Sequence, residues 1–540
     1  MKAPAGKIAR RDFLNGIGRA AGSAAMLRTM AAMGLVAAAP GCGSSSASSG
    51  APVSPTPRPA APSARPGDWP ANAGAGKSVI ILGAGIAGMT TAYEMTRLGY
   101  ACTVLEATSV AGGRNRTIRA GDTVSETDSS QTCSFDAGSD LYFNPGPARI
   151  PHHHEFLLGY CRQFDVPLES FINDNRAALM HSDAAFSGQP QIARRVIADT
   201  RGHIASLLAS AVNQNALDQE LSAADKENIL QMLREFGDLD SQYGYVGTSR
   251  GGFPGQEEAG SRRRGELVSP LQLQELINDS FWQLRLDYPH GLEQQPTMLQ
   301  PVGGMDRIAR AFETRVAGDI IYEAVVTEIR KTGGGVGIVY HDRFGMPLRL
   351  DADYCVCTIP ATVLRSIAND FSGAHQAAIG SFVYTSAGKL AFQSRRFWEQ
   401  DHNIYGGISW TTADITQIWY PNGAFGKPTG ILVGAYPFGG VAGNTFTAQT
   451  PEARINSSIS QGSSLHPEYA NEVDRGISVA WAKVPFQLGA WGTSDPGVLL
   501  TPDGNIFFAG EHLSILQSWQ EGAILSAYRA IDGVVQSHTA

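Results

Sequence analysis

A glycine-rich turn between two short apolar runs constrains the fold of this 540-residue chain more than any other feature. Residues 79–82 read Val-Ile-Ile-Leu, a pattern typical of a buried parallel strand. The run Gly83-Ala84-Gly85-Ile86-Ala87-Gly88 follows, and then come a helical stretch, a second apolar run at 102–105 and Glu106. This order, with the acid 18 residues after the last glycine, is typical of a dinucleotide-binding βαβ unit. The sequence therefore predicts an α/β fold with a Rossmann-like domain.

The residue types in this unit suit phosphate and ribose binding. Gly83 permits the tight turn, Gly85 lets the backbone approach a pyrophosphate, and Gly88 lets the helix pack closely. The helix start offers oriented N–H groups to phosphates, and Glu106 can accept hydrogen bonds from a ribose diol. We expect cofactor contacts from Gly83, Gly85, Ile86, Ala87, Gly88, Glu106 and Ala107. These contacts do not separate NAD from FAD.

A second glycine pair, Gly112-Gly113, precedes Arg114 shortly after the acid. A guanidinium at this position can meet pyrophosphate oxygens with two parallel N–H bonds, so we expect Gly113 and Arg114 to contact the cofactor. The alternative is a glycine turn that carries a solvated arginine. Here the chain begins to resemble the flavin amine oxidases, and the resemblance favours FAD over NAD.

The segment Tyr142–Pro151 resembles the stretch of L-amino-acid oxidases whose arginine binds the substrate carboxylate. The resemblance gives this role to Arg149, whose guanidinium would be held in place by backbone that Pro147 and Pro151 restrict. It also places four residues of this segment at the cofactor: Gly146, Pro147, Ala148 and Arg149. A surface salt bridge is the alternative for Arg149.

Three further segments are similar to parts of the substrate pocket in that family. Lys389, in an apolar run at 386–392, corresponds to the lysine that holds a water near the flavin N5, with an edge-strand lysine as the alternative. Tyr420 corresponds to the tyrosine whose hydroxyl binds the substrate carboxylate, and Trp419 would then point the opposite way. Trp519 corresponds to an aromatic wall of the pocket.

The C-terminal region is similar to the last cofactor-binding motif of the flavin amine oxidases. The run 505–512 reads as a strand that ends in Gly510-Glu511, and 518–523 opens a helix. The resemblance implies that Glu511 binds a ribityl hydroxyl, while N–H groups of the helix start stabilise the reduced flavin. The expected contacts are Gly510, Glu511, Ser518, Trp519, Gln520, Glu521, Gly522 and Ala523.

Two more expectations about the cofactor come from the same resemblance. The backbone of Val326 is expected to meet the adenine, because Val326 lies in a strand-like run that matches the family's adenine strand. The cysteine that links flavin in monoamine oxidases has no counterpart here, so the resemblance implies non-covalent FAD.

The order of the motifs predicts a FAD-binding domain assembled from discontinuous segments, together with a mixed-sheet substrate domain. We expect the FAD-binding domain at 77–150, 301–365 and 486–540, and the substrate domain at 151–300 and 366–485. The 151–300 segment contains a helical insertion, which reads as helix from Ile192 to about Glu235 and in relatives shapes the substrate entrance and subunit contacts. A homodimer is therefore expected.

The N-terminal region predicts export. Residues 1–41 contain Arg10-Arg11, a twin-arginine pattern, before an alanine-rich stretch that is too short to span a membrane. Residues 42–76 form a Ser/Pro/Ala-rich linker. We expect a periplasmic or extracellular protein with Cys42 as a candidate lipid anchor, and cleavage after Ala39 is the alternative.

The charge of the chain argues against a nucleic-acid partner. The formal net charge of −8 combines +5 from residues 1–41 with −13 from the rest, and a body that acidic would repel phosphates. We also expect no metal site. The expected partners are an L-amino acid and dioxygen.

Together the motifs predict FAD-dependent oxidative deamination of an L-amino acid to a 2-oxo acid, with release of ammonia and hydrogen peroxide. A flavin amino-acid 2-monooxygenase that forms an amide shares every motif, so the sequence leaves this second function open. The sequence also leaves open a polyamine or monoamine oxidase and a non-catalytic flavin-binding protein. The side-chain preference is not readable from the motifs.

Overall fold

The computed structural model describes residues 65–217, 221–253, 262, 265–284 and 288–539. The predicted export signal, Cys42 and most of the predicted linker lie outside the described residues. The described chain forms two compact units, one at Asp174–Gln295 and the other made of 65–173 and 296–539. Within these ranges, no helix combines the length and the apolar character needed to cross a bilayer.

The larger unit contains a parallel sheet with the strand order β10-β2-β1-β14-β21. Its strands are β10 (Ile320–Ile321), β2 (Ala101–Leu105), β1 (Ser78–Leu82), β14 (Tyr354–Cys357) and β21 (Ile506–Phe508). These strands come from three distant parts of the sequence, which confirms the predicted Rossmann-like domain of discontinuous segments.

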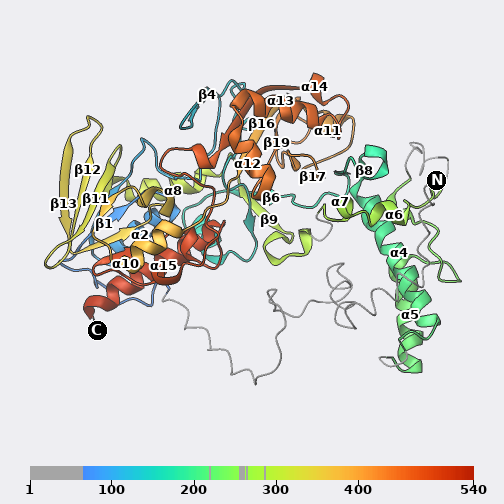
Figure 1. Cartoon of the computed structure of the whole chain (residues 1–540), viewed down its shortest axis with the longest axis horizontal. Helices are drawn as coiled ribbons and strands as arrows, with labels where there is room; N and C mark the ends of the chain where they lie inside the picture. The colour runs from blue at the N-terminus through green and yellow to red at the C-terminus, as the bar shows by residue number, and fades with distance from the viewer. Residues whose placement is uncertain (1–64, 218–220, 254–261, 263–264, 285–287, 540) are drawn as a thin grey trace, which may run out of the picture. The chain divides into compact units, whose positions relative to one another are not determined.

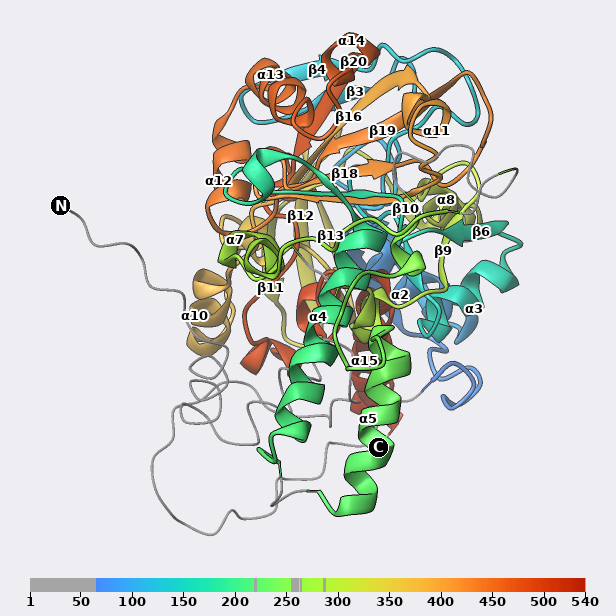
Figure 2. The ribbon, with the colours of Figure 1, turned by 90° about the vertical axis from the view of Figure 1, so that its right-hand side faces the viewer.

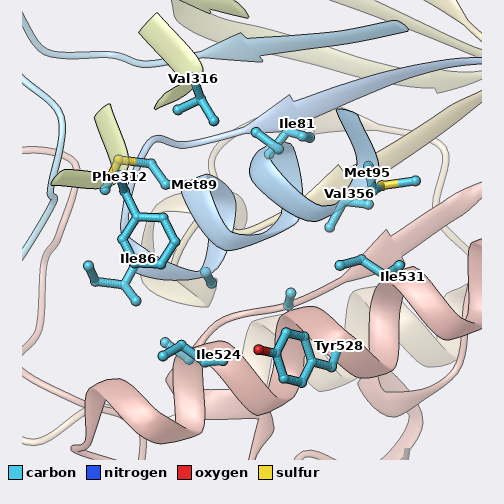
Figure 3. Packing of buried hydrophobic residues seen from close by; sticks show 14 of the residues in the cluster. Ile81, Ile86, Met89, Met95, Phe312, Val316, Val356, Ile524, Tyr528 and Ile531 are labelled. Atoms are coloured by element: carbon cyan, nitrogen blue, oxygen red, sulfur yellow. The ribbon is translucent and has the colours of Figure 1, made fainter. Parts of the chain in front are cut away.

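This parallel sheet shares one buried core with helices that include α2 (Ile86–Arg97), α8 (Asp306–Val316) and α15 (Gln520–Thr539). Figure 3 shows Ile524, Tyr528 and Ile531 of α15 pointing toward α2. Because parallel strands end at one edge of a sheet, the segments that follow β1 and β21 lie at the same edge. The packing of α2 and α15 therefore positions the two glycine-containing motifs together.

A second sheet adjoins the Rossmann-like segments, with the order β13-β12-β11-β15. It consists of β13 (Pro347–Ala352), β12 (Val336–His341), β11 (Val325–Lys331) and β15 (Ala368–Asn369). Figure 1 shows β11, β12 and β13 as adjacent yellow arrows. β11 pairs antiparallel with β12 and parallel with β15, which places the predicted adenine strand inside this sheet, with a shift of register between Val326 and Glu328.

The same unit contains a run of antiparallel strands in the order β20-β16-β19-β18-β17. They are β20 (Val473–Ala480), β16 (Gly388–Arg395), β19 (Thr429–Ala435), β18 (Gln417–Tyr420) and β17 (Gly407–Thr411). A smaller sheet has the order β5-β9-β6, from β5 (Ile150–Pro151), β9 (Met298–Pro301) and β6 (Leu168–Phe171). These two sheets carry the predicted substrate-binding residues Arg149, Lys389 and Tyr420 or their neighbours.

The described part of the larger unit contains further strands and α-helices. They are β3 (Thr123–Ser125), β4 (Ser130–Thr132), α3 (Glu155–Gln163), α9 (Ala361–Leu364), α10 (Gly373–Ser381), α11 (Phe397–Gln400), α12 (Gly440–Ala448), α13 (Pro451–Gly462) and α14 (Tyr469–Glu472). Of these, α3 and the connections around α11, α13 and α14 matter for the sites described below.

The smaller unit is mainly helical, as the predicted insertion requires. Its elements are β7 (Leu179–His181), β8 (Gln191–Ile192), α4 (Ala193–Asn213), α5 (Ala223–Gly237), α6 (Leu273–Leu276) and α7 (Asp279–Trp282). Figure 2 shows α4 and α5 as neighbouring green helices, and apolar side chains of both share a core. The helical stretch predicted from Ile192 is therefore two helices, because Ser222 and Asp225 form a capping box that begins α5.

Candidate active site

The three glycines of the first turn have three different environments. Gly83 has a φ of +101°, the left-handed region in which a glycine is favoured. A Cβ on Gly88 would lie 1.9 Å from the carbonyl oxygen of Gly83, whereas a Cβ on Gly85 would meet nothing within 4 Å. The helix therefore packs tightly at Gly88 and leaves an open cradle at Gly85, where the sequence predicts the pyrophosphate.

Glu106 directly follows β2 beside this turn. Its Oε2 accepts the Ala84 N–H at 2.8 Å, and its Oε1 accepts the N–H and the hydroxyl of Thr108 at 2.9 and 2.8 Å. The Glu106 carbonyl accepts the Ala324 N–H at 2.8 Å, which brings the start of the β11 region to the acid. Val326, predicted at the adenine, follows two residues later and is 8% exposed.

The second glycine pair and the C-terminal motif meet through an ion pair. Arg114 donates from Nη1 to Oε1 of Glu511 at 2.8 Å, and the N–H of Ser518 donates to the other carboxylate oxygen at 2.9 Å. The Gly112 N–H donates to the Ala84 carbonyl at 2.8 Å, so this cluster adjoins the first turn. The structure thus brings together the predicted cofactor residues of three sequence regions.

Lys389 lies in the middle of the unit and contacts the 142–149 segment. Its Nζ donates to the carbonyl oxygens of Gly146 at 2.6 Å and Asn144 at 3.2 Å, and the residue is 1% exposed. Burial lowers the pKa of Lys389 well below its usual range, and the nearby Arg149 charge lowers it further. The two basic residues predicted for the substrate pocket are therefore neighbours.

Aromatic rings surround these two basic groups. The guanidinium carbon of Arg149 lies 4.7 Å from the ring centroid of Trp419 and 5.8 Å from that of Phe171. The Nζ of Lys389 lies 4.7 Å from the centroids of both Trp419 and Tyr436. Cation–π attraction favours this placement of Arg149. We call Arg149, Lys389, Trp419 and Tyr436 the cation pocket.

The placement of Tyr420 corrects the prediction that its hydroxyl binds a substrate carboxylate. Tyr420 is 1% exposed, and its hydroxyl is hydrogen-bonded to Ser409 at 2.7 Å and to His466 Nε2 at 2.6 Å. Neighbouring residues of a strand point to opposite faces, and it is Trp419 that faces the cation pocket. The tyrosine ring beside Lys389 belongs to Tyr436, immediately after β19.

Glu521 is predicted to contact the cofactor at the helix start, and its side chain is engaged elsewhere. Its carboxylate accepts the N–H groups of Phe156 and Leu157 at 3.0 and 2.8 Å, in the first turn of α3. Burial raises the pKa of Glu521 even though these hydrogen bonds lower it. The side chain therefore caps α3, and only the backbone of Glu521 is available for the predicted flavin contact.

The other predicted residues at the start of α15 keep groups available to a ligand. Trp519 is half-buried, and its ring packs edge-on against His154 with centroids 5.2 Å apart. The Oε1 atom of Gln520 is buried and has no hydrogen-bond partner within the described chain. Gly522 and Ala523 are buried in the first turn of the helix.

Sequence analysis missed two aromatic contributors besides Tyr436. Phe171 ends β6 and reaches Arg149, and Trp481 donates from Nε1 to the Pro145 carbonyl at 2.9 Å. Trp481 thereby supports the backbone that carries Gly146, Pro147 and Ala148. Neither aromatic lies in a glycine or proline motif, so no local pattern marks them.

These residues fit FAD. The open cradle at Gly85, the acid at the end of β2 and the buried, unsatisfied Gln520 oxygen each suit one part of a dinucleotide. Gly83 to Gly88 would hold the pyrophosphate, Glu106 the ribose, and Arg114 with Glu511 the middle of the cofactor. FAD bound there would supply two-electron redox chemistry beside the cation pocket.

Comparison with known proteins agrees with this geometry. A family described as flavin containing amine oxidoreductase matches residues 86–534. The flavin-dependent L-tryptophan oxidase RebO of Lentzea aerocolonigenes is 27% identical over 493 residues, covering 85% of this chain and 98% of that protein. The L-amino-acid oxidase of Echis ocellatus is 25% identical over 484 residues, covering 85% of this chain and 89% of that one.

Solved structures show the same fold at lower identity. The cyclohexylamine oxidase from Brevibacterium oxydans IH-35A aligns with a TM-score of 0.55 at 15% identity, over 85% of this chain and 99% of that one. A putrescine oxidase variant aligns with a TM-score of 0.53 at 14% identity, over 86% of this chain and 99% of its own. The family match spans most of the chain, from the start of α2 through the Gly510-Glu511 motif, and on this evidence the chain belongs to the flavin containing amine oxidoreductases.

Proposed function

We propose that this protein is an L-amino-acid oxidase with non-covalent FAD. In the proposed reaction an L-amino acid, dioxygen and water give a 2-oxo acid, ammonia and hydrogen peroxide. The single observation that carries the proposal is the cation pocket, in which the guanidinium of Arg149 and the amine of Lys389 share the ring of Trp419.

The charge of this pocket favours a substrate with an acid group. A carboxylate would neutralise the Arg149 charge with two parallel N–H bonds in surroundings poor in water, where such bonds are strong. An amine without an acid group would add a positive charge beside Arg149, and like charges at close range disfavour binding. The pocket therefore suits amino acids better than simple amines or polyamines.

Each member of the pocket has a role in the proposed reaction. Arg149 binds and orients the carboxylate, which presents the Cα–H to the cofactor side. Trp419 and Tyr436 exclude water and form apolar walls. Lys389, with its lowered pKa and two backbone carbonyl partners, holds a fixed neutral amine that can bind a water or accept a proton.

The relatives support the substrate class. Two of them carry the names of an L-tryptophan oxidase and an L-amino-acid oxidase. The rings of Trp419 and Tyr436, together with Trp519 as the wall that the family resemblance implies, suit a large apolar or aromatic side chain. Export by the twin-arginine route, a lipid anchor at Cys42 and a homodimer stay predictions.

An anaerobic screen tests the proposal. The purified flavin-loaded protein is mixed with each of the twenty L-amino acids and, in parallel, with the corresponding decarboxylated amines, and flavin bleaching at 450 nm is followed. Air is then admitted, and 2-oxo acid, peroxide, amide and carbon dioxide are measured. Bleaching by amino acids with peroxide and 2-oxo acid supports the proposal. Amide with carbon dioxide indicates the monooxygenase, faster bleaching by amines indicates an amine oxidase, and no bleaching indicates a non-catalytic flavoprotein.

A further inference from the structure

We propose that His402, His466 and Glu468 form a binding site for a divalent transition-metal ion of the Zn²⁺ class. The site is separate from the cation pocket, and its residues have no part in the proposed oxidation. One ligand atom from each residue lies within 4.8 Å of the other two. Two imidazoles and a carboxylate are a ligand set that Zn²⁺ accepts, with a fourth position for water.

Two short connections position the ligands. His402 follows α11, His466 lies between α13 and α14, and Glu468 is the residue before α14. Glu468 Oε1 already contacts the Nε2 of His402 and lies 3.9 Å from the Nδ1 of His466. Ligand atoms around a tetrahedral Zn²⁺ are ~3.3 Å apart, so side-chain shifts of roughly an ångström complete the site.

The Nδ1 atom of His466 is the independent observation that points to a ligand. The His466 side chain is 0% exposed, and Nδ1 has no hydrogen-bond partner within the described chain. A buried nitrogen left without a partner costs free energy. An ordinary hydrogen bond between His402 and Glu468 leaves that nitrogen unsatisfied, whereas a metal ion would satisfy it.

The other ring nitrogen of His466 is held as metal-binding histidines usually are. Its Nε2 pairs with the Tyr420 hydroxyl at 2.6 Å, and that hydroxyl pairs with Ser409 at 2.7 Å. With the proton on Nε2, the imidazole donates to Tyr420 and presents the Nδ1 lone pair to the ion. Tyr420, which does not face the cation pocket, thus acquires a positioning role here.

Calorimetric titration of the full-length, flavin-loaded, tag-free protein with zinc sulfate after chelator treatment tests the proposal. The variants are His402→Asn and Glu468→Gln at the ligands and Tyr420→Phe behind His466. His341→Asn, at an exposed histidine of β12, is the matched control. His402 is 33% exposed, so its replacement is expected to leave the fold intact, which the flavin spectrum and melting temperature verify.

We expect one zinc ion per chain in the wild type and in His341→Asn, with a rise in melting temperature on zinc addition. Both ligand variants should bind at least tenfold more weakly and lose the rise, and Tyr420→Phe should lose about 10- to 100-fold in affinity. Absence of saturable binding overturns the proposal. Equal affinity in the wild type and both ligand variants also overturns it, because the zinc would then occupy another site.

Discussion

Replacement of Arg149 by methionine is the most direct test of the cation pocket. Methionine keeps an apolar chain between Trp419 and Phe171 but removes the guanidinium, which lies 4.7 and 5.8 Å from those ring centroids. Loss of one partner of a buried, hydrogen-bonded charge pair costs about 2–5 kcal/mol. Because about 1.4 kcal/mol is tenfold in rate or affinity, a central value of ~3 kcal/mol corresponds to a roughly 150-fold loss of kcat/KM for amino acids.

The assay compares an L-amino acid with the amine that lacks its carboxylate, by anaerobic stopped-flow bleaching of the flavin. The rate of flavin bleaching by the amine should change little in Arg149→Met, because the amine has no carboxylate to contact the guanidinium. Arg349→Met, at an arginine of β13 that is 54% exposed and paired with Asp351, is the matched control and should behave as wild type. A loss below about fivefold with amino acids, or an equal loss with both substrates, would refute the carboxylate role.

The same variant has a second readout at Lys389. The Arg149 charge is one of the two causes that lower the Lys389 pKa, after burial. Removal of that charge must therefore raise the Lys389 pKa, and any limb of the pH–rate profile that reports Lys389 should move to higher pH. A shift to lower pH would contradict the proximity of the two groups.

Three further predictions address the cofactor turn, the lysine and the fold. Gly85→Ala should keep the fold, since its Cβ meets nothing in the protein, but should weaken FAD binding. Gly88→Ala should lower the melting temperature, since its Cβ would lie 1.9 Å from a carbonyl oxygen. Thermal unfolding and FAD titration distinguish the two variants. The unfolded chain binds a proton at Lys389 at pH values where the folded chain does not. The free energy of unfolding of the wild type should therefore rise, relative to that of Lys389→Met, between neutral pH and pH 9.5. The rise is at most about 1.4 kcal/mol per pH unit and is measured by urea titration. Arg454→Met should lower the free energy of unfolding by about 3–5 kcal/mol in the same titrations. The reason is that it leaves the carboxylate of Glu126, its fully buried partner at 2.7 Å, without its ion-pair partner. A loss under ~1 kcal/mol would contradict this account.

The cofactor half of the site could be predicted because its chemistry is local. A left-handed φ at Gly83, an open approach at Gly85 and a close contact at Gly88 are each imposed within six consecutive residues. An acid at the end of the next strand completes the pattern. Such a motif determines its own geometry once the parallel strands form, so residue types and spacing are sufficient.

The substrate half depends on pairing between distant strands, and here prediction failed at Tyr420. The sequence predicts that Trp419 and Tyr420 point to opposite faces of β18. Which of the two faces the pocket depends on how β18 pairs with its neighbouring strands. Trp419 pairs with Val433 of β19 and with Ile408 of β17, and that pairing turns its ring toward Lys389. Tyr436 reaches the same place only because β19 ends one residue earlier. No local pattern encodes either fact, since a one-residue slip of register reverses every side chain.

The register of β18 also explains why one strand can serve two sites of opposite chemistry. Its Trp419 ring contacts the guanidinium of Arg149 and the amine of Lys389, while the Tyr420 hydroxyl on the other face fixes the imidazole of His466. A cation pocket must exclude further positive charge, and a metal site must attract it. The backbone of β18 and the rings of Trp419 and Tyr420 lie between the cation pocket and the proposed metal site. Substitution at Tyr420 should therefore change metal affinity without changing the preference for substrates with a carboxylate. The register of β18 therefore places Trp419 on the face toward Arg149 and Lys389 and Tyr420 on the face toward His466. A register slip in β18 would abolish both sites.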